Sequence, residues 1–271
     1  MTYTSFIPQL GLGTFGRTGE AGVEAMLKAI EIGYRHLDTA QSYDTERQVG
    51  EAVRRSGLPR SNFFVTTKVA DSRLGKADFL PSVERSLDEL GFDHVDLLLI
   101  HWPSYRDEVP LEEYMLELVE AKARGYARLI GVSNFTIAHL ERTRTLLGDG
   151  AIATNQVEIH PYLQSPRLRD HARSRGLMLT AYQPLAKAQV SSDPLLNRIA
   201  ERHGVTAAAI ALAFLMQEGH AVIPASGSEA NLRANYAARD VRLTGDEMTA
   251  IRGLERGYRR INPVKSPRWD D

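Results

Sequence analysis

The chain has 271 residues, of which 43% are hydrophobic and 25% are charged, and its formal net charge is −1. No basic stripe or run of like charge stands out, so the charge pattern argues against binding to nucleic acid or to an anionic membrane surface. The chain has no cysteine, which excludes disulfides, thiolate nucleophiles and cysteine-based zinc sites.

Short runs rich in Val, Ile and Leu recur along the chain and predict eight β-strands. Parallel strands that are buried on both faces have near-continuous apolar runs of this kind. In chain order the runs cover residues 9–15, 34–40, 63–69, 95–102, 127–134, 153–160, 177–185 and 220–226.

Amphipathic segments with apolar residues at three-to-four spacing separate these runs and predict helices. Several of them end in glycine, as helices often do. The segments include residues 20–33, 77–91, 110–125, 194–204, 206–219, 229–237 and 245–254, and residues 261–271 form a turn-rich tail. The alternation predicts the α/β class, and eight such units predict a single-domain (β/α)8 TIM barrel over residues 1–271.

Three glycines near the start of the chain suggest a different fold. Gly11, Gly13 and Gly16 match the dinucleotide-binding pattern G-x-G-x-x-G, and Asp38 follows at about the position of a ribose-binding acid. A Rossmann fold is therefore an alternative, but Pro8 counts against a long central strand here, because proline is confined to strand ends and edges. We favour a tight turn in which the glycines let another segment approach closely.

Polar side chains follow the predicted strands at the point where each strand ends. In a barrel these ends surround one mouth, which is where such enzymes place their active sites. Each residue alone has an ordinary explanation, such as an aspartate that caps the next helix. The combination is more specific, and it comprises Asp38, Tyr43, Lys68, His101, Ser133, Asn134, Asn155, Gln156, Tyr182 and Ser226.

Asp38 would be a costly buried charge unless another group paired with it. Lys68 is the natural partner, because neighbouring parallel strands place their ends side by side, and it can also face Tyr43. A phenol has a pKa near 10, and an ammonium about 4 Å away stabilises its phenolate by roughly 4 kcal/mol at an effective dielectric near 20. We therefore expect the pKa of Tyr43 to be lowered, against the effect of burial. With His101 donating a hydrogen bond to a carbonyl oxygen, this is a general-acid site for carbonyl reduction.

Several longer motifs resemble those of one enzyme family. They are GYRHLDTAQSYDTE, TTK, LLIHWP, GVSNF and NQVEIHPY, and the likeness covers nearly the whole chain. In this order and spacing they resemble the aldo-keto reductases. The resemblance implies that Tyr43 gives a proton to a carbonyl oxygen while a nicotinamide cofactor gives a hydride to the carbon, without a metal ion. The implied catalytic tetrad is Asp38, Tyr43, Lys68 and His101.

The same resemblance implies the contacts of the cofactor and the class of substrate. The residues that match those holding the nicotinamide carboxamide, or stacking on its ring, are Ser133, Asn134, Gln156 and Tyr182. Trp102, beside His101, is a candidate wall of the substrate pocket, and Phe15 on the first loop is a second candidate. The implied substrates are small aldehydes, dicarbonyls such as methylglyoxal, and keto sugar acids such as 2,5-diketo-D-gluconate.

The segment after the eighth strand departs from the family pattern. Many members read I-P-K-S and then R-x-x-E-N, and the lysine and arginine of that pattern contact the 2′-phosphate of NADPH. Ser226 and Asn235 match the pattern, whereas its lysine, arginine and glutamate are replaced by Ala225, Asn231 and Ala234.

A phosphate group still needs a cation or the amides of a helix N-terminus. The candidates that remain are Ser226, Ser228, the amides near Glu229, and Arg233, which lies at a different helical phase from the usual arginine. We expect NADPH as the cofactor, with NADH or dual use left open.

Other chemistry is also open from the residues. Lys68 could form a Schiff base in a barrel aldolase, although Asp38 would keep it charged. A nicotinamide-binding protein of this fold could also act as a sensor without turnover. His36 with Asp38, or Glu158 with His160, could ligate a metal, but we favour core hydrogen bonds for both histidines and expect no metal site.

The remaining segments give weaker expectations. The link after the seventh strand is short, so we expect it to cover little of the cofactor. In the tail, Lys265, Arg268 and Trp269 either cover the mouth and attract a sugar acid or lie loose in solvent. No secretory signal or apolar run of about 18 residues occurs, so we expect a soluble, cytoplasmic protein with no membrane partner. No exposed apolar stripe predicts an oligomer, and we expect a monomer.

Overall fold

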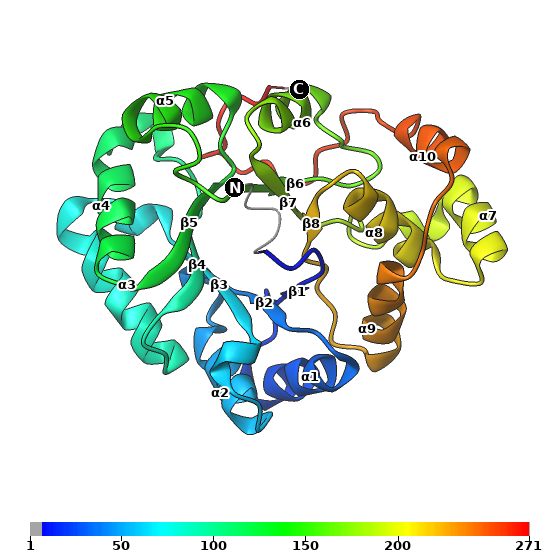
Figure 1. The fold of residues 1–271 in the computed structure, drawn as a ribbon, viewed down its shortest axis with the longest axis horizontal. Coiled ribbons are helices and arrows are strands. Elements are labelled where there is room, and N and C mark those ends of the chain that lie inside the picture. The colour runs from blue at the N-terminus through cyan, green and yellow to red at the C-terminus, as the bar shows by residue number, and fades with distance from the viewer. Residues whose placement is uncertain (1–6, 271) are drawn as a thin grey trace.

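The chain forms a ring of eight parallel strands with helices around the outside (Figure 1). The structure is a computed structural model that describes residues 7–270. Each strand pairs with the next along the chain, so the order in the sheet is the order in the sequence. The predicted (β/α)8 barrel is confirmed. The strands are β1 (Leu12–Gly13), β2 (His36–Asp38), β3 (Phe64–Val69), β4 (Val95–Ile100), β5 (Ala127–Ser133), β6 (Thr154–Glu158), β7 (Met178–Tyr182) and β8 (Ala221–Val222).

The glycine-rich start of the chain closes this ring. The Gly11 amide donates to the carbonyl of Val222 at 2.9 Å, so the segment before β1 pairs with β8. A side-chain carbon on Gly11 would lie 2.7 Å from Nδ1 of His36, and one on Gly13 would lie 2.9 Å from a backbone oxygen of β8's continuation. The glycines therefore permit close approach of strands, as expected, and the Rossmann alternative is wrong.

The first and last strands are shorter than the predicted runs. Each has two residues, where the apolar pattern covered seven. Pro8 precedes β1 and Pro224 follows β8, and proline has no amide hydrogen with which to extend a ladder. The polar residues that follow β8 consequently lie on a loop at the mouth of the barrel.

The helices follow the strands and enclose the ring (Figure 1). Two helices lie between β7 and β8, and two short helices follow β8, as predicted. No single helix between residues 7 and 270 is long and apolar enough to cross a membrane. The helices Pro194–His203 and Ala207–Gln217 pass that test only as a pair, by length and composition, and the chain bends by 90° between them. The helices are α1 (Gly19–Ile32), α2 (Glu46–Arg55), α3 (Lys76–Leu90), α4 (Leu111–Ala123), α5 (Ile137–Leu147), α6 (Pro166–Ser174), α7 (Pro194–His203), α8 (Ala207–Gln217), α9 (Glu229–Tyr236) and α10 (Gly245–Arg252).

Alternate residues of each strand face inward and outward, which divides the core in two. On β4, Leu98 and Ile100 belong to the large cluster between sheet and helices, whereas Leu97 and Leu99 belong to a smaller cluster inside the ring. The inner cluster fills the barrel interior. Inward-facing positions at the C-terminal strand ends are left for polar groups, and these form the site.

Candidate active site

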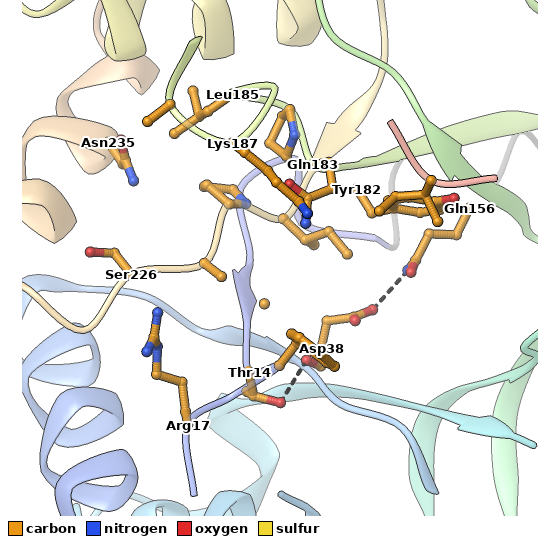
Figure 2. Close-up of a pocket in the computed structure, with 18 of the residues that line it drawn as sticks. Thr14, Arg17, Asp38, Gln156, Tyr182, Gln183, Leu185, Lys187, Ser226 and Asn235 are labelled. Atoms are coloured by element: carbon orange, nitrogen blue, oxygen red, sulfur yellow. Dashed lines mark hydrogen bonds between the residues drawn. The ribbon is translucent and has the colours of Figure 1, made fainter. Parts of the chain in front are cut away.

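A pocket of about 780 Å³ opens at the C-terminal ends of the strands (Figure 2). Of the polar strand-end residues and the substrate-side candidates, all but Lys68 and Asn155 line it, and the Asn155 side chain instead bonds the backbone of Phe135. The predicted residues that line it are Phe15, Asp38, Tyr43, His101, Trp102, Ser133, Asn134, Gln156, Tyr182, Ser226 and Asn235. Residues more than 200 positions apart in the sequence thus meet at one opening, which is what the reasoning from strand ends predicted.

Lys68 lies beneath this pocket and pairs with Asp38, as predicted. The register of β2 and β3 aligns Asp38 with Thr66, so Lys68, two residues further on, extends to the same face. Its Nζ lies 2.5 Å from Oδ1 of Asp38 and donates to the carbonyl of Thr39 at 2.8 Å. Burial would lower the pKa of Lys68, but the interactions with Asp38 and Tyr43 together outweigh burial and raise it. Lys68 is therefore held as a cation.

The other carboxylate oxygen of Asp38 is also occupied. Gln156 donates from its side-chain amide to Oδ2 of Asp38 at 2.7 Å (Figure 2). The carboxylate thus accepts one hydrogen bond from a cation and one from a neutral amide, with almost no exposure to solvent. This pairing fixes the direction of Lys68.

Tyr43 stands above the ion pair on the short 3-10 turn Gln41–Tyr43 that follows β2. The Lys68 ammonium lies 4.9 Å from the centre of its ring. The pKa of Tyr43 is nevertheless raised, because burial outweighs the effect of Lys68 and Asp38 adds to the rise. Lys68 does lower this pKa, as expected, but the expected net lowering is wrong, because burial of the phenol is the larger effect.

His101 follows β4 and faces the phenol. Its Nε2 lies 3.4 Å from the Tyr43 hydroxyl, and its Nδ1 lies 3.3 Å from the hydroxyl of Ser42. Burial, together with the charges of Lys68 and Lys265, lowers the pKa of His101 to about 3. The imidazole is therefore neutral at pH 7 and carries a single N–H. A Ser42 hydroxyl that donates to Nδ1 leaves this proton on Nε2, next to the phenol. Sequence reasoning missed Ser42.

The predicted carboxamide-binding residues gather at the ends of β5, β6 and β7. Ser133 donates to the carbonyl of Gln156 at 2.8 Å. Asn134 donates to the carbonyl of His101 at 3.0 Å and accepts from the Tyr182 hydroxyl at 2.8 Å. Its backbone has φ of 62°, a left-handed conformation that asparagine tolerates better than most residues. These bonds connect the ends of four neighbouring strands, β4 to β7.

The far end of the pocket lies between the first loop and α9. Ser226 and Asn235 both border it (Figure 2). The Asn235 side chain is buried and makes no hydrogen bond in the described part of the chain. Arg233, by contrast, is 63% exposed and pairs with Glu229 at 2.8 Å, outside the pocket. Arg17, which sequence reasoning did not single out, lines this end instead.

Comparison with known proteins decides the family. The chain matches the model of the Aldo/keto reductase family over residues 9–256. It belongs to this family. Methylglyoxal reductase DkgB of Salmonella typhi is 42% identical over 265 residues, which cover 97% of this chain and 99% of that protein. The 2,5-diketo-D-gluconic acid reductase B of a Corynebacterium species is 39% identical over 250 residues, covering 91% of this chain and 89% of that protein.

Solved structures agree with this result. A crystal structure that carries 2,5-diketo-D-gluconic acid reductase B as a provisional name is 43% identical, with a TM-score of 0.95, and covers 100% of this chain and 96% of its own. An aldo-keto reductase complexed with NADPH is 28% identical, with a TM-score of 0.90, and covers 97% and 89%. The chain is an NAD(P)H-dependent oxidoreductase that acts on carbonyl compounds.

The pocket of this aldo-keto reductase suits a nicotinamide dinucleotide. It is large and extends from the carboxamide-binding candidates at one end to Ser226 and Asn235 at the other. The Nε of Arg17 is buried there without a hydrogen-bond partner among the described residues. Unpaired polar groups at a pocket wall are costly unless a ligand binds them. The residues present therefore fit the family's cofactor.

The link after β7 forms one wall of the reductase pocket. It contributes Gln183, Leu185 and Lys187 to the lining, together with neighbouring residues (Figure 2). Lys187 has φ of 52°, and both alanines beside it are also left-handed. The link therefore forms part of the pocket wall, and the expectation that it covers little of the cofactor stays a prediction.

The C-terminal tail of the reductase lies across the mouth and is not loose. Glu158, at the end of β6, accepts the backbone amides of Arg260 and Ile261, each at 2.8 Å. Trp269 packs edge-on against Trp102, with ring centres 6.1 Å apart. Trp269 and Lys265 therefore contact the mouth through Trp102, whereas Arg268 is exposed, and attraction of a sugar acid stays a prediction. No pattern in the sequence indicates that Glu158 anchors a segment about a hundred residues away.

Additional residues of the mouth complete the substrate side. Lys265 lies 5.9 Å from the Trp102 ring and pairs with Asp71 at 2.7 Å. Phe15 is 65% exposed and meets the Tyr43 ring edge-on at 5.2 Å. Phe15 therefore borders the Tyr43 ring, Trp102 lines the same pocket, and the ammonium near Trp102 is already paired with Asp71.

The two histidines considered as metal ligands make core hydrogen bonds. Nε2 of His36 lies 3.1 Å from the Thr66 hydroxyl, and Nε2 of His160 lies 3.1 Å from Glu158. Within residues 7–270 no group of three or more histidine, aspartate and glutamate side chains could hold a metal ion. The favoured interpretation of His36 and His160 is confirmed.

Proposed function

We propose that this aldo-keto reductase uses NADPH to reduce small dicarbonyls and keto sugar acids, with Tyr43 as the proton donor. One observation carries the proposal. The Tyr43 hydroxyl and Nε2 of His101 lie 3.4 Å apart at the floor of the pocket, directly above the buried Lys68–Asp38 pair. Two hydrogen-bond donors converging on one point can bind a carbonyl oxygen.

The raised pKa of Tyr43 suits a proton donor. A phenol that stays neutral at pH 7 has its proton available when the substrate binds. Bound reduced nicotinamide would supply a hydride to the carbonyl carbon. Tyr43 would give its proton to the carbonyl oxygen, and Lys68 would stabilise the negative charge that develops on the phenol. Because this stabilisation acts only as the charge forms, it favours the transition state over the bound substrate.

His101 would orient the carbonyl. With a pKa lowered to about 3, it is a neutral donor that does not compete with Tyr43 as the acid. A neutral N–H can bind the substrate oxygen throughout the reaction. The role of His101 is thus to position the oxygen, whereas Tyr43 transfers the proton.

The same geometry disfavours a Schiff-base mechanism. The Lys68 side chain is 0% exposed, does not border the pocket and has a raised pKa. An amine nucleophile must be neutral and reach the carbonyl carbon. Lys68 meets neither condition.

The cofactor would lie across the mouth of the barrel. We assign its carboxamide to Ser133, Asn134 and Gln156, its nicotinamide ring to the face of Tyr182, and its adenosine half to the Ser226 and Asn235 end. The support is the shared pocket and the NADPH complex of a structurally similar reductase. The direct bonds from Ser133 and Asn134 to neighbouring strands would hold these polar groups in place for the ligand.

The substrate class follows from the mouth and from the relatives. Trp102 and Phe15 are large apolar side chains that line the same pocket as Tyr43, and Phe15 contacts its ring. Relatives of similar length are named for methylglyoxal and for 2,5-diketo-D-gluconic acid. We propose these two compounds as the first substrates to measure.

The test is turnover with a defined variant. Purified protein is mixed with NADPH and either methylglyoxal or 2,5-diketo-D-gluconate, and the loss of nicotinamide absorbance is followed. The proposal expects turnover in the wild type and its loss in Tyr43→Phe, with NADPH binding retained. NADPH binding without turnover on a broad panel of carbonyls would instead identify a sensor.

A further inference from the structure

Two cations project into the pocket without an acidic partner. Arg17 and Lys187 line it, and neither makes an ion pair in the described part of the chain. Asp38 is the one carboxylate in the lining, and Lys68 and Gln156 already occupy its two oxygens. The pocket therefore carries positive charge that nothing in residues 7–270 balances, which is typical of an anion-binding site.

Arg17 is held in position by the start of α1. Its backbone amide donates to the carbonyl of Thr14 at 2.9 Å. A side-chain carbon on Gly22, in the first half of α1, would lie only 2.0 Å from the Arg17 carbonyl oxygen. The helix thus packs directly on this backbone, and a residue other than glycine at position 22 would displace it. This contact gives Arg17 a defined place at the pocket edge.

The guanidinium group reaches the loop between β8 and α9. It lies 3.6 Å from the position that a side-chain carbon on Gly227 would take, so it rests against this loop. Its Nε is buried and has no hydrogen-bond partner among the described residues. Figure 2 shows Arg17 pointing toward Ser226, with Asn235 beyond, while Lys187 lies near Tyr182 at the other end.

We infer that Arg17 is the cation that binds the 2′-phosphate of NADPH in this chain. The inference rests on the proposed function, because it concerns the cofactor of the same site. The family pattern has a lysine and an arginine at positions 225 and 231, where this chain has Ala225 and Asn231. Arg17 brings a replacement charge to the same loop from the opposite side, out of the β1–α1 connection.

The chemistry of the group matches a phosphate. A guanidinium offers a planar fork of donors that binds two phosphate oxygens at once. The Ser226 hydroxyl borders the same end of the pocket, and the amides that open α9 follow it. Arg233, the arginine closest in sequence to the family's position, is engaged with Glu229 at 2.8 and 3.0 Å and faces solvent.

The experiment compares ligands that differ by one phosphate. Dissociation constants are measured by fluorescence or calorimetry for NADPH against NADH, and for 2′,5′-ADP against 5′-AMP. The proteins are the wild type, Arg17→Ala, Arg17→Gln, which keeps part of the stem, and Arg233→Ala as a matched control. No carbonyl substrate is needed, so the readout is independent of turnover.

The wild type is expected to bind NADPH more tightly than NADH. Arg17→Ala and Arg17→Gln should both weaken NADPH and 2′,5′-ADP by about 10- to 100-fold, the usual range for a hydrogen-bonded charge. NADH and 5′-AMP should change by less than about threefold, and Arg233→Ala should bind all four ligands like the wild type, since exposed pairs contribute little. Raising the salt concentration should weaken NADPH binding more in the wild type than in either variant.

Three results would overturn the inference. Equal losses for NADPH and NADH would place Arg17 at the pyrophosphate, and unchanged NADPH binding in both variants would remove it from the site. A wild type that binds both cofactors equally would show that no residue reads the 2′-phosphate. Failure of the proposed function can be distinguished from failure of this inference. A wild type that does not reduce any carbonyl can still bind NADPH more tightly than NADH and lose this preference in the Arg17 variants. If Arg17→Ala unfolds, as thermal denaturation would show, Arg17→Gln decides.

Discussion

Nζ of Lys68 lies 2.5 Å from Oδ1 of Asp38, and the two side chains are 0% and 2% exposed. Tyr43 sits over this pair, yet the pKa of its phenol is raised. The ion pair therefore does not make the resting phenol acidic. In the proposed mechanism it supplies a fixed cation that stabilises the phenolate only when the proton has left, in an environment where an unassisted phenolate would be costly.

Removing one member of this pair should destabilise the fold. Lys68→Met leaves the Asp38 carboxylate buried with Gln156 as its remaining partner, and loss of one half of a buried pair costs about 3–5 kcal/mol. The free energy of unfolding, from urea titration, should fall by that order. The double variant Asp38→Asn/Lys68→Met removes both charges and should lose less than Lys68→Met. If the free energy of unfolding of Lys68→Met lay within about 1 kcal/mol of the wild-type value, the expected cost of an unpaired buried carboxylate would be contradicted.

The rate of carbonyl reduction should vary little with pH across the neutral range. Tyr43 keeps its proton to above pH 10 because its pKa is raised, and His101 stays neutral because its pKa is about 3. Neither group changes charge between about pH 5 and 9, given the ordinary values near 10 and 6.5. We expect kcat for NADPH-dependent reduction to be flat there and to fall only in alkali. A step near pH 6.5 that disappears in His101→Gln would show that His101 titrates during catalysis.

Stability should decrease on the acid side, in part because of His220. Burial, with Arg169 and Arg173 nearby, lowers the pKa of His220 to about 4. The unfolded chain takes up this proton at about pH 6.5 and the folded chain does not, so stability is present above that pH and is lost as pH falls toward 4. Unfolding curves between pH 7 and 4.5 should show a shallower decline in His220→Gln. Equal slopes would mean that His220 is not neutral in the fold.

Glu158 should control the substrate side through the tail. Burial would raise its pKa, but hydrogen bonds from His160 and from the amides of Ile261 and Arg260 lower it, so it is a carboxylate acceptor. Glu158→Gln replaces one acceptor oxygen with a donor and should loosen the tail. We expect faster limited proteolysis between residues 260 and 268, and a severalfold higher KM for the carbonyl with kcat largely kept.

A matched control distinguishes the anchor from any loss of charge near the tail. Asp71→Asn removes the partner of Lys265, a pair that is about one-third exposed on both sides. Partly exposed pairs contribute about 0–1 kcal/mol, so proteolysis and KM should stay near wild type. Equal effects of Asp71→Asn and Glu158→Gln would contradict a specific role for Glu158.

The architecture and the gathering of polar side chains at the strand ends could be predicted from the sequence for the same physical reason. Short apolar runs alternating with amphipathic segments report on burial on both faces, and parallel strands bring their ends together. The pairing of Asp38 with Lys68 could therefore be predicted from the sequence alone. The direction of the Tyr43 pKa shift could not be predicted, because it depends on how much of the phenol is buried and on how far Asp38 offsets the charge of Lys68.

Residues on loops escaped prediction. Arg17 lies in a loop, where no periodic pattern indicates which way a side chain points. Its position depends on the packing of Gly22 against its backbone. Lys187 lies in a left-handed stretch that the residue types do not announce, because alanine and lysine rarely adopt it. Contacts between Glu158 and the tail depend on long-range folding, which local sequence does not encode.

The central claim is that the phenol of Tyr43 hands its proton to the substrate, and Tyr43→Phe tests it most directly. The variant removes one hydroxyl and keeps the ring beside Phe15 and His101. We expect kcat for reduction of methylglyoxal or 2,5-diketo-D-gluconate to fall by about 100- to 10,000-fold, the usual contribution of a general acid. The dissociation constant for NADPH and the melting temperature should stay close to those of the wild type. A folded Tyr43→Phe protein that binds NADPH and keeps kcat within about tenfold of the wild type, below that usual contribution, would contradict the account.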